Sequence, residues 1–158
     1  MKVYKALIAN RTMAEKGFEY VEHTADVEFI ASGRTIESAF KNSFLALFNT
    51  MADIKKLAKE KSDVKRLKVN DRARTLEDLL WFGLQDALSV TDAEGVYAYG
   101  IESLSVSTSM GDYIIDAVLK AKAKEQKFSK LDVKGVSQFD LKIVKGRKGY
   151  KTSIVLDV

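Results

Sequence analysis

Two aspartates far apart in the sequence carry the strongest chemical signal. Asp26 closes the segment His23-Thr24-Ala25-Asp26, and Asp157 lies in the apolar run from Ile154 to Val158. A carboxylate among apolar neighbours loses hydration, so it persists where a cation or a hydrogen-bond donor compensates. Two close carboxylates repel each other unless a proton or a cation lies between them. If the strands that carry these acids are neighbours, Asp26 and Asp157 can share one cation.

The ligands that the sequence offers indicate which cation this would be. Carboxylate oxygens without thiolates favour Ca²⁺ or Mg²⁺, and a nearby imidazole would leave room for Zn²⁺ or Mn²⁺. His23 is the only histidine, although a single histidine near a strand start is more often a hydrogen-bonded structural residue. The aspartates have structural alternatives as well, with Asp26 as a cap or Asx-turn residue and Asp157 as a solvated acid.

Several classes of protein are disfavoured by what the sequence lacks. It has no cysteine, which excludes disulfides, thiolate catalysis, iron–sulfur clusters and Cys-based zinc sites. It also has no Gly-rich phosphate loop before a helix and no His-x-x-x-His pair, so metal-dependent phosphoester hydrolysis is only a minor alternative. No apolar stretch approaches the roughly 18 residues that span a bilayer, and residues 1–16 lack the apolar core of a signal peptide. We expect a soluble cytoplasmic protein that is not an enzyme.

Basic residues are concentrated in the last third of the chain. The net charge is +4, but residues 113–158 hold eleven Lys or Arg against five Asp or Glu. Within this region Lys120, Lys122 and Lys124 alternate with alanines, which places three like charges on one strand face. Such a row is typical of an edge strand that lysines protect from aggregation. It would alternatively attract RNA or an acidic partner.

Hydrophobic periodicity predicts two helices among several strands. Apolar residues recur at helical spacing from Ile36 to Met51 after a capping Thr35, and again from Leu76 to Leu88, with Thr75 and Asp78 as a capping box and Gly95 as the stop. The remaining segments predict strands at 18–21, 27–32, 63–69, 96–108, 113–124, 133–144 and 150–158, with hairpin turns at 110–112 and 146–149. We therefore expect one α+β domain over residues 17–158, in which a mainly antiparallel sheet packs against two amphipathic helices. Residues 1–16 have no clear period and are expected to form a flexible N-terminal extension.

Four segments of the chain resemble the archease family, small accessory proteins that activate the RtcB-type tRNA-splicing RNA ligase. The matching segments are Glu22-His23-Thr24-Ala25-Asp26-Val27, then Gly33-Arg34-Thr35-Ile36-Glu37-Ser38-Ala39-Phe40, then Asp132-Val133-Lys134-Gly135-Val136, and finally Val155-Leu156-Asp157-Val158. The chain departs from the family at Ser137-Gln138-Phe139, where its members frequently carry another histidine.

The resemblance implies a fold, a site and a partner. The domain would be archease-like, with a divalent metal, Ca²⁺ foremost, held by Asp26 and Asp157, and with His23 as a further candidate ligand. Lys130 and Asp132 are implied to take part in activating the ligase. The implied role is to promote guanylylation of the RNA ligase and its repeated turnover, with an indirect association with tRNA. A chaperone-like modulator of a tRNA methyltransferase is the alternative role.

Overall fold

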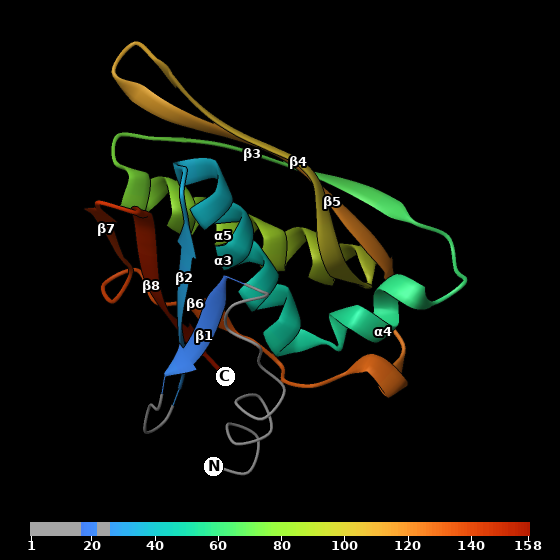
Figure 1. The fold of residues 1–158 in the computed structure, drawn as a ribbon. Helices are drawn as coiled ribbons and strands as arrows, with labels where there is room; N and C mark the ends of the chain where they lie inside the picture. Colours follow the sequence, from blue (N-terminus) through green and yellow to red (C-terminus); the bar gives the residue numbers. More distant parts are fainter. Residues whose placement is uncertain (1–16, 22–25) are drawn as a thin grey trace.

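The computed structural model describes residues 17–21 and 26–158, which form two antiparallel sheets packed around two long helices (Figure 1). The α+β prediction and the antiparallel pairing are confirmed. The predicted N-terminal extension over residues 1–16 lies outside the described part of the chain, and so does His23.

The first sheet carries both ends of the described chain. Its strands follow the order β1-β2-β8-β6, and β7 also pairs with β8. The bounds are β1 (Phe18–Val21), β2 (Val27–Gly33), β6 (Gly135–Val136), β7 (Lys142–Gly146) and β8 (Gly149–Asp157). The last strand is therefore central, because β2 pairs with it on one side and β6 and β7 pair with it on the other.

The second sheet has three strands in the order β3-β5-β4. The bounds are β3 (Lys65–Ala73), β4 (Val96–Ser109) and β5 (Asp112–Ala123). The long β4–β5 hairpin turns at Met110-Gly111, within the predicted connection. Strand β5 is thus the central strand of this sheet and has no free edge.

The two predicted helices are α3 (Ile36–Met51) and α5 (Leu76–Glu94). Helix α3 begins at Thr35, whose hydroxyl accepts a hydrogen bond from the Ser38 backbone while the Ser38 hydroxyl accepts one from the Thr35 backbone. Such reciprocal capping satisfies amide groups that have no partner within the helix. Helix α5 ends at Gly95, which takes the left-handed conformation with φ 64°, a geometry that glycine adopts without a Cβ clash.

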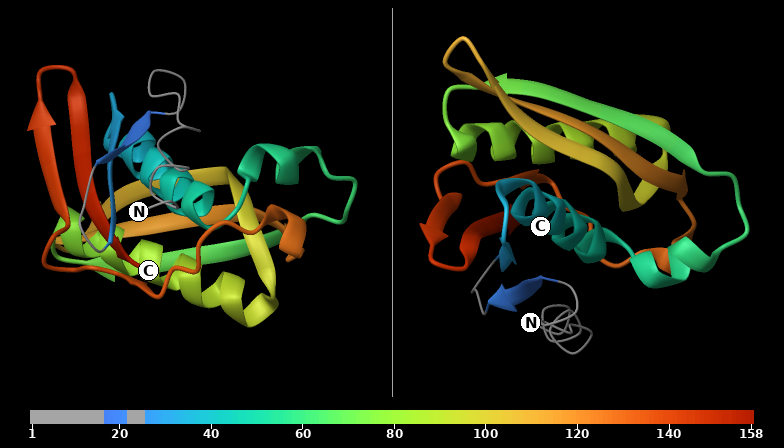
Figure 2. Two further views of the ribbon diagram at one scale, coloured as in Figure 1. Left: turned by 90° about the horizontal axis from the view of Figure 1, so that it is seen from below. Right: turned by 45° about the horizontal axis from the view of Figure 1, so that its top comes forward.

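Helix α3 joins the two sheets. It packs against β2 and β8 on one side and against β4 on the other, whereas α5 packs against β3, β4 and β5 and reaches β6 (Figures 1 and 2). The apolar stripe of α3 is buried almost completely, with Phe40, Phe44 and Leu47 at 0% exposure. Burial of such side chains stabilises the fold by about 1.5 to 3 kcal/mol each, so this stripe fixes the positions of the strands that carry the candidate site.

Two local predictions were wrong, and two short elements were not predicted. The predicted strand at 133–144 is divided into β6 and β7, because Ser137 and Asp140 close a turn through a 2.8 Å hydrogen bond between their side chains. A six-residue helix α4 (Ile54–Lys59) and a 3-10 turn at Gln126–Phe128 were not predicted. Segments this short contain too few turns for a helical repeat of apolar residues to be recognised in the sequence. Strand β3 begins later than predicted and continues to Ala73.

Candidate functional site

The strands that carry Asp26 and Asp157 are neighbours, as expected. Strands β2 and β8 pair antiparallel with Val27 opposite Leu156. One further step of this register would put Asp26 opposite Asp157, at the end where β2 begins and β8 ends, but the pairing stops at Val27 and Asp26 forms a bend just before the strand. Residues directly opposite in an antiparallel pair have Cβ atoms roughly 4.5–5.5 Å apart and point to the same sheet face. The fold therefore brings together the strand ends beside these two acids, which lie 131 residues apart in the sequence.

The face on which these acids lie is accessible. Val27 and Leu156 point into the core against α3, so Asp157, the next residue of β8, points to the other face of the sheet, and Asp26 lies in the bend that leads into β2. Asp26 is half-buried and Asp157 is exposed. A partner molecule can therefore reach both carboxylates, unlike acids enclosed in a core.

Glu28 shares this face and was missed by the sequence analysis. It lies two residues after Asp26 in β2, and alternation along a strand would have indicated it. Its carboxylate accepts a hydrogen bond from the Ser153 hydroxyl at 3.4 Å. Because Ser153 pairs with Ile30, this contact draws the Glu28 side chain along the sheet, away from Asp157. Glu28 thus serves as a nearby acid that is not directed at the pair.

Strand β6 anchors the segment that contains Asp132 beside the end of β8. The Lys134 amide donates to the Asp157 carbonyl at 2.7 Å, and Gly135 pairs with Asp157. On its other side β6 is held by α5, where Trp81 Nε1 donates to the Val136 carbonyl at 2.7 Å. Asp132 is exposed and lies two residues before this anchored position. Asp132 therefore lies two residues before a backbone hydrogen bond to Asp157 itself.

Lys130 is held at the end of helix α3. Its Nζ donates to the Asn49 carbonyl at 3.0 Å and to the Asn49 side-chain oxygen at 3.3 Å, and its amide donates to the Met51 carbonyl at 2.9 Å. A cation near a helix C-terminus interacts favourably with the helix dipole. Lys130 is half-buried, so it has a structural contact in addition to the role that the resemblance implies.

The chemistry of the donor set fits a cation that prefers oxygen ligands. Asp26 and Asp157 supply two carboxylates and no sulfur, which is the ligand type of Ca²⁺ and Mg²⁺. Over residues 17–21 and 26–158 no group of three or more His, Asp or Glu side chains gathers at one point. The described residues therefore offer two protein ligands at this position, and His23 lies outside them.

The edge-strand explanation for the row Lys120, Lys122 and Lys124 is wrong, and Lys122 is not available to the alternative, an RNA or acidic partner. Strand β5 is central rather than an edge, and Lys122 is only 4% exposed. Its Nζ donates to the carbonyls of Leu57, Ala58 and Glu60 at 2.9, 3.3 and 2.7 Å and lies 4.8 Å from the Tyr99 ring centroid. Helix α4 covers this part of the sheet, so the middle lysine of the row cannot contact RNA or an acidic partner.

A second pair of carboxyl groups lies between β3 and α5. Asp71 follows Leu67 and Val69 on the row of β3 that faces the core, and one of its oxygens is buried without a conventional partner. Burial, with a smaller contribution from hydrogen bonding and repulsion by Asp86, raises the pKa of Asp71 to about 7. Asp71 thus keeps its proton at pH values where a solvated aspartate is ionised. The predicted strand ended at Val69, so this pair was missed.

None of the helices within the described residues is long and apolar enough to cross a membrane.

Comparison with known proteins identifies the family. Residues 18–158 match the model of the Archease protein family (MTH1598/TM1083). The archease of Methanosarcina mazei is 30% identical over 145 residues, which cover 90% of this chain and 97% of the relative, and that of Pyrococcus furiosus is 31% identical over 80% of this chain and 87% of the relative.

Solved structures agree at the level of the fold. The solution structure of Methanobacterium thermoautotrophicum protein 1598 superposes with a TM-score of 0.75 at 22% identity, over 90% of this chain and 99% of that one. The crystal structure of an archease from Thermotoga maritima, named a possible chaperone, superposes with a TM-score of 0.56 at 17% identity, over 87% of this chain and 94% of that one. With the match of the family model to nearly the whole described chain, these results show that the chain belongs to the archease family.

Proposed function

We propose that this protein is a metal-dependent accessory protein that activates an RtcB-type tRNA-splicing RNA ligase. It would promote guanylylation of the ligase and so allow repeated turnover. The observation that carries the proposal is the antiparallel pairing of β2 and β8, whose last pair, Val27 opposite Leu156, lies one residue from each aspartate. Family membership supports the choice of partner.

In this proposal Asp26 and Asp157 hold the divalent cation, Ca²⁺ foremost. When bound, the cation would supply positive charge beside the phosphates of the ligase's nucleotide, which offsets their repulsion. The protein residues orient the pair: β6 fixes the end of β8 through the Lys134 amide, and the apolar contacts of β2 with α3 fix the start of β2. Lys130 and Asp132 lie on the segment that leads into β6 and would contact the ligase.

The decisive experiment compares aspartate variants in ligase activation. Asp26→Asn and Asp157→Asn remove one carboxylate each with little change in size, and Glu28→Gln is the matched control because it neutralises an acid on the same face. We expect both aspartate variants to lower the rate of ligase guanylylation and the number of RNA joining events per ligase by at least about tenfold, a loss of about 1.4 kcal/mol. The control should retain the activity of the parent protein.

Calorimetric titration with Ca²⁺ separates loss of the metal from loss of the partner. The parent protein and Glu28→Gln should release or absorb heat on binding, whereas the aspartate variants should not. If folded Asp26→Asn and Asp157→Asn proteins activated the ligase as well as the parent protein, the metal-dependent form of the proposal would be wrong.

A second candidate function is a chaperone-like modulator of a tRNA methyltransferase. The archease of Thermotoga maritima is named a possible chaperone, and this chain exposes 96% of Phe139 and 96% of Met110. Exposed apolar side chains can cover the apolar surface of a client protein. This role predicts that aggregation of the methyltransferase is suppressed equally by the parent protein and by Asp157→Asn, since the carboxylate pair takes no part. Phe139→Ser and Met110→Ser should reduce the suppression.

A further inference from the structure

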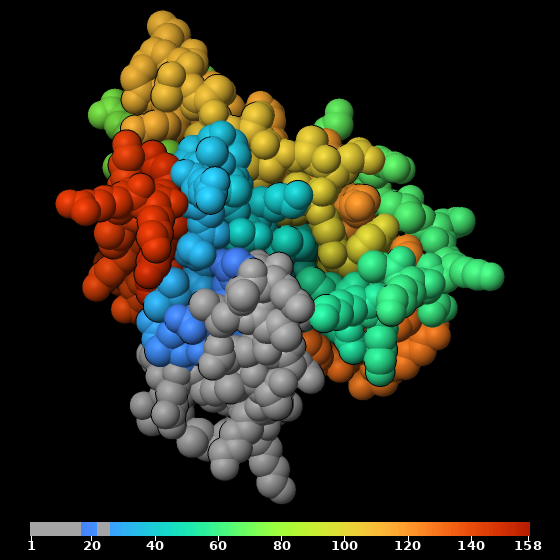
Figure 3. All heavy atoms as spheres, in the orientation of Figure 1, coloured from blue at the N-terminus to red at the C-terminus, as the bar shows by residue number. Residues whose placement is uncertain are grey.

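Strands β2 and β8 have a basic end opposite to the acidic one. At the far end of the pair Gly33 lies opposite Tyr150. Gly33 follows Val27 by six residues of β2, so the two ends of the strand pair are roughly 20 Å apart. Here the β7–β8 hairpin turns through the two-residue loop Arg147-Lys148, because Gly146 pairs with Gly149. Figure 3 shows this hairpin, in red, projecting at the edge of the molecule.

The hairpin packs directly against the turn between β2 and α3. A Cβ atom built at Gly149, where φ is 129°, would lie 2.3 Å from the Gly33 carbonyl oxygen and 2.7 Å from Arg34 Cα. Only a residue without a side chain allows this approach, so Gly149 brings Arg34 beside the hairpin. Two adjoining grooves with volumes of about 700 and 620 Å³ run along the contact.

Five cations line these grooves, and we call them the hairpin basic surface: Arg34, Lys145, Arg147, Lys148 and Lys151. Among the residues that the structure describes, no acidic one lines either groove. None of the five is in an ion pair with another residue in the described part of the chain. By contrast, Lys and Arg side chains of β3 pair with Glu94, Glu102 and Asp112, and Lys124, just after β5, pairs with Asp92. Like charges held together without counter-charges raise the free energy of the fold and create a local positive potential, so they point to an anionic ligand.

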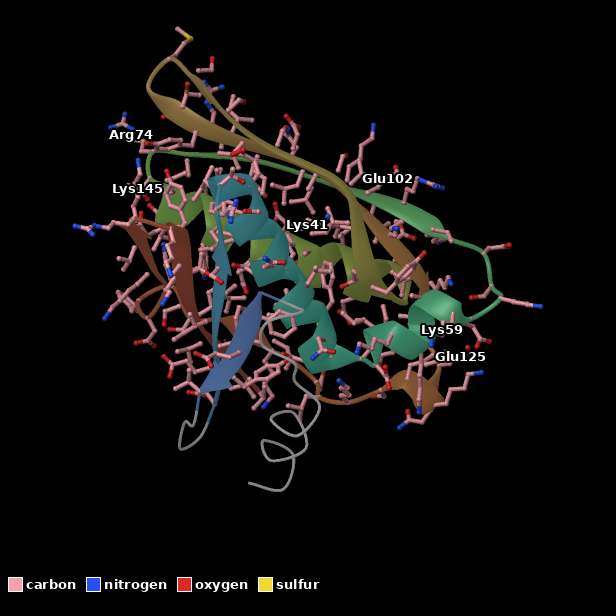
Figure 4. All side chains as sticks on the ribbon, viewed as in Figure 1. Lys41, Lys59, Arg74, Glu102, Glu125 and Lys145 are labelled. Atoms are coloured by element: carbon pink, nitrogen blue, oxygen red, sulfur yellow. The ribbon has the colours of Figure 1, made fainter. Side chains whose placement is uncertain are left out.

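Further positive charge lies at the same end of the molecule. In the view of Figure 4, Arg74 lies on the same side of the molecule as Lys145, and Lys59 and Glu125 lie on the opposite side. Both long helices begin here, after Arg34 and Arg74, with their N-caps at Thr35 and Thr75. The N-terminal ends of helices carry partial positive charge, which adds to the field of the side chains.

The shape and composition of the surface favour single-stranded RNA over a membrane. Membrane-binding loops insert apolar side chains, but the tip of this hairpin is Arg147-Lys148 between glycines. The groove wall includes Tyr150, whose ring lies 5.7 Å from Lys145 Nζ. Cations that follow a phosphate backbone beside an aromatic ring that can stack on a base are typical of single-strand binding. Arginine forks also match phosphate geometry.

We propose that the hairpin basic surface binds the phosphate backbone of single-stranded RNA directly. The identification of the nucleic acid as RNA rests on the proposed function, because the ligase joins RNA ends, whereas phosphate binding rests on the surface itself. The chain would then hold RNA at one end of the β2–β8 pair while Asp26 and Asp157, about 20 Å away, face the partner enzyme.

The test measures RNA binding without the ligase. A fluorescein-labelled 20-nucleotide RNA without self-complementarity is titrated with the full chain at several salt concentrations, in the presence of a metal chelator so that the carboxylate pair takes no part. The triple variant Lys145→Gln, Arg147→Gln, Lys148→Gln is compared with a matched triple variant at the other end, Lys55→Gln, Lys59→Gln, Lys61→Gln. All six side chains are exposed, so the melting temperature of each variant should change little, and circular dichroism checks this.

Counterion release gives the expected size of the effect. Each phosphate contact to a single strand contributes about 0.7 to the slope of log K against log salt concentration. Removal of three contacts should lower that slope by about 2 and weaken binding about 100-fold at roughly 0.1 M salt. The matched variant should lose less than about threefold.

Four outcomes would overturn the proposal: no RNA binding by the parent protein, an unchanged salt slope in the hairpin variant, an equal loss in the matched variant, or binding of vesicles rich in phosphatidylserine without binding of RNA. Because no ligase is present, failure here is distinct from failure of the proposed function. Loss of ligase activation in Asp157→Asn with RNA binding intact would support two separate sites.

Discussion

The Asp71–Asp86 pair makes the stability of the fold depend on pH in a predictable direction. The folded protein raises the pKa of Asp71 from 3.8 to about 7, chiefly by burial. Between these two values the folded state holds a proton that the unfolded chain has released. Stability from this group is therefore fully present below about pH 4 and is lost as the pH rises through about 7. Asp71→Asn remains neutral at all pH values and escapes this loss.

The size of the effect follows from the two pKa values and from the exposure of Asp71. The full difference between 3.8 and about 7 would correspond to roughly 4 kcal/mol, at about 1.4 kcal/mol for each pH unit. Asp71 is only half-buried, and solvent screening weakens such interactions. We therefore expect Asp71→Asn to be more stable than the parent protein by about 1 kcal/mol at pH 8, which raises the melting temperature by about 2–4 °C. At pH 4 the two proteins should melt together.

Thermal denaturation followed by circular dichroism at pH 4, 6 and 8 measures this difference. Asp63→Asn is the matched control, because Asp63 is exposed and shows no ion pair with any residue that the structure describes. Asp86→Asn removes the neighbouring carboxylate and should reduce the pH dependence without abolishing it, since burial is the larger cause. A variant Asp71→Asn that was less stable by the same amount at pH 4 and pH 8 would refute the reasoning.

Two further predictions concern residues whose surroundings only the structure reveals. Lys122→Met should lower the free energy of unfolding, measured by urea denaturation, by about 2 to 3 kcal/mol, because carbonyl groups near the end of α4 lose charged donors. Lys120→Met should change it by less than about 1 kcal/mol, because Lys120 Nζ lies over the Tyr99 ring at 5.7 Å from its centroid. Gly149→Ala should cost more than about 2 kcal/mol, since its Cβ would collide with the Gly33 carbonyl. Gly111→Ala, also at positive φ but with open space around it, should cost only about 1 to 2 kcal/mol, and equal melting temperatures for the two glycine variants would contradict the close approach.

Part of the candidate site could be predicted from the sequence. Strand alternation indicated that Asp157 lies on a strand and Asp26 at the entrance of one, and the family resemblance supported the pairing of the two acids at one cation. That β2 and β8 are hydrogen-bonded neighbours is confirmed by their register. The same strand alternation could have predicted that Glu28 lies on this face. Its contact with Ser153 could not be predicted, because that contact joins two strands that are far apart in the sequence. The roles of Lys130 and Asp132 stay predictions.

The sequence by itself determined the two long helices with their caps, most of the strands and the family. These features depend on neighbours within a few residues, where periodicity and capping chemistry act directly. Only the tertiary structure decided that the strands divide into two sheets, that Lys122 is buried beneath α4, that Asp71 faces Asp86, and that Arg34 joins the hairpin basic surface. The physical reason is that burial and charge environment are set by elements far away in the sequence, and packing between them is chosen by the whole core rather than by any local segment.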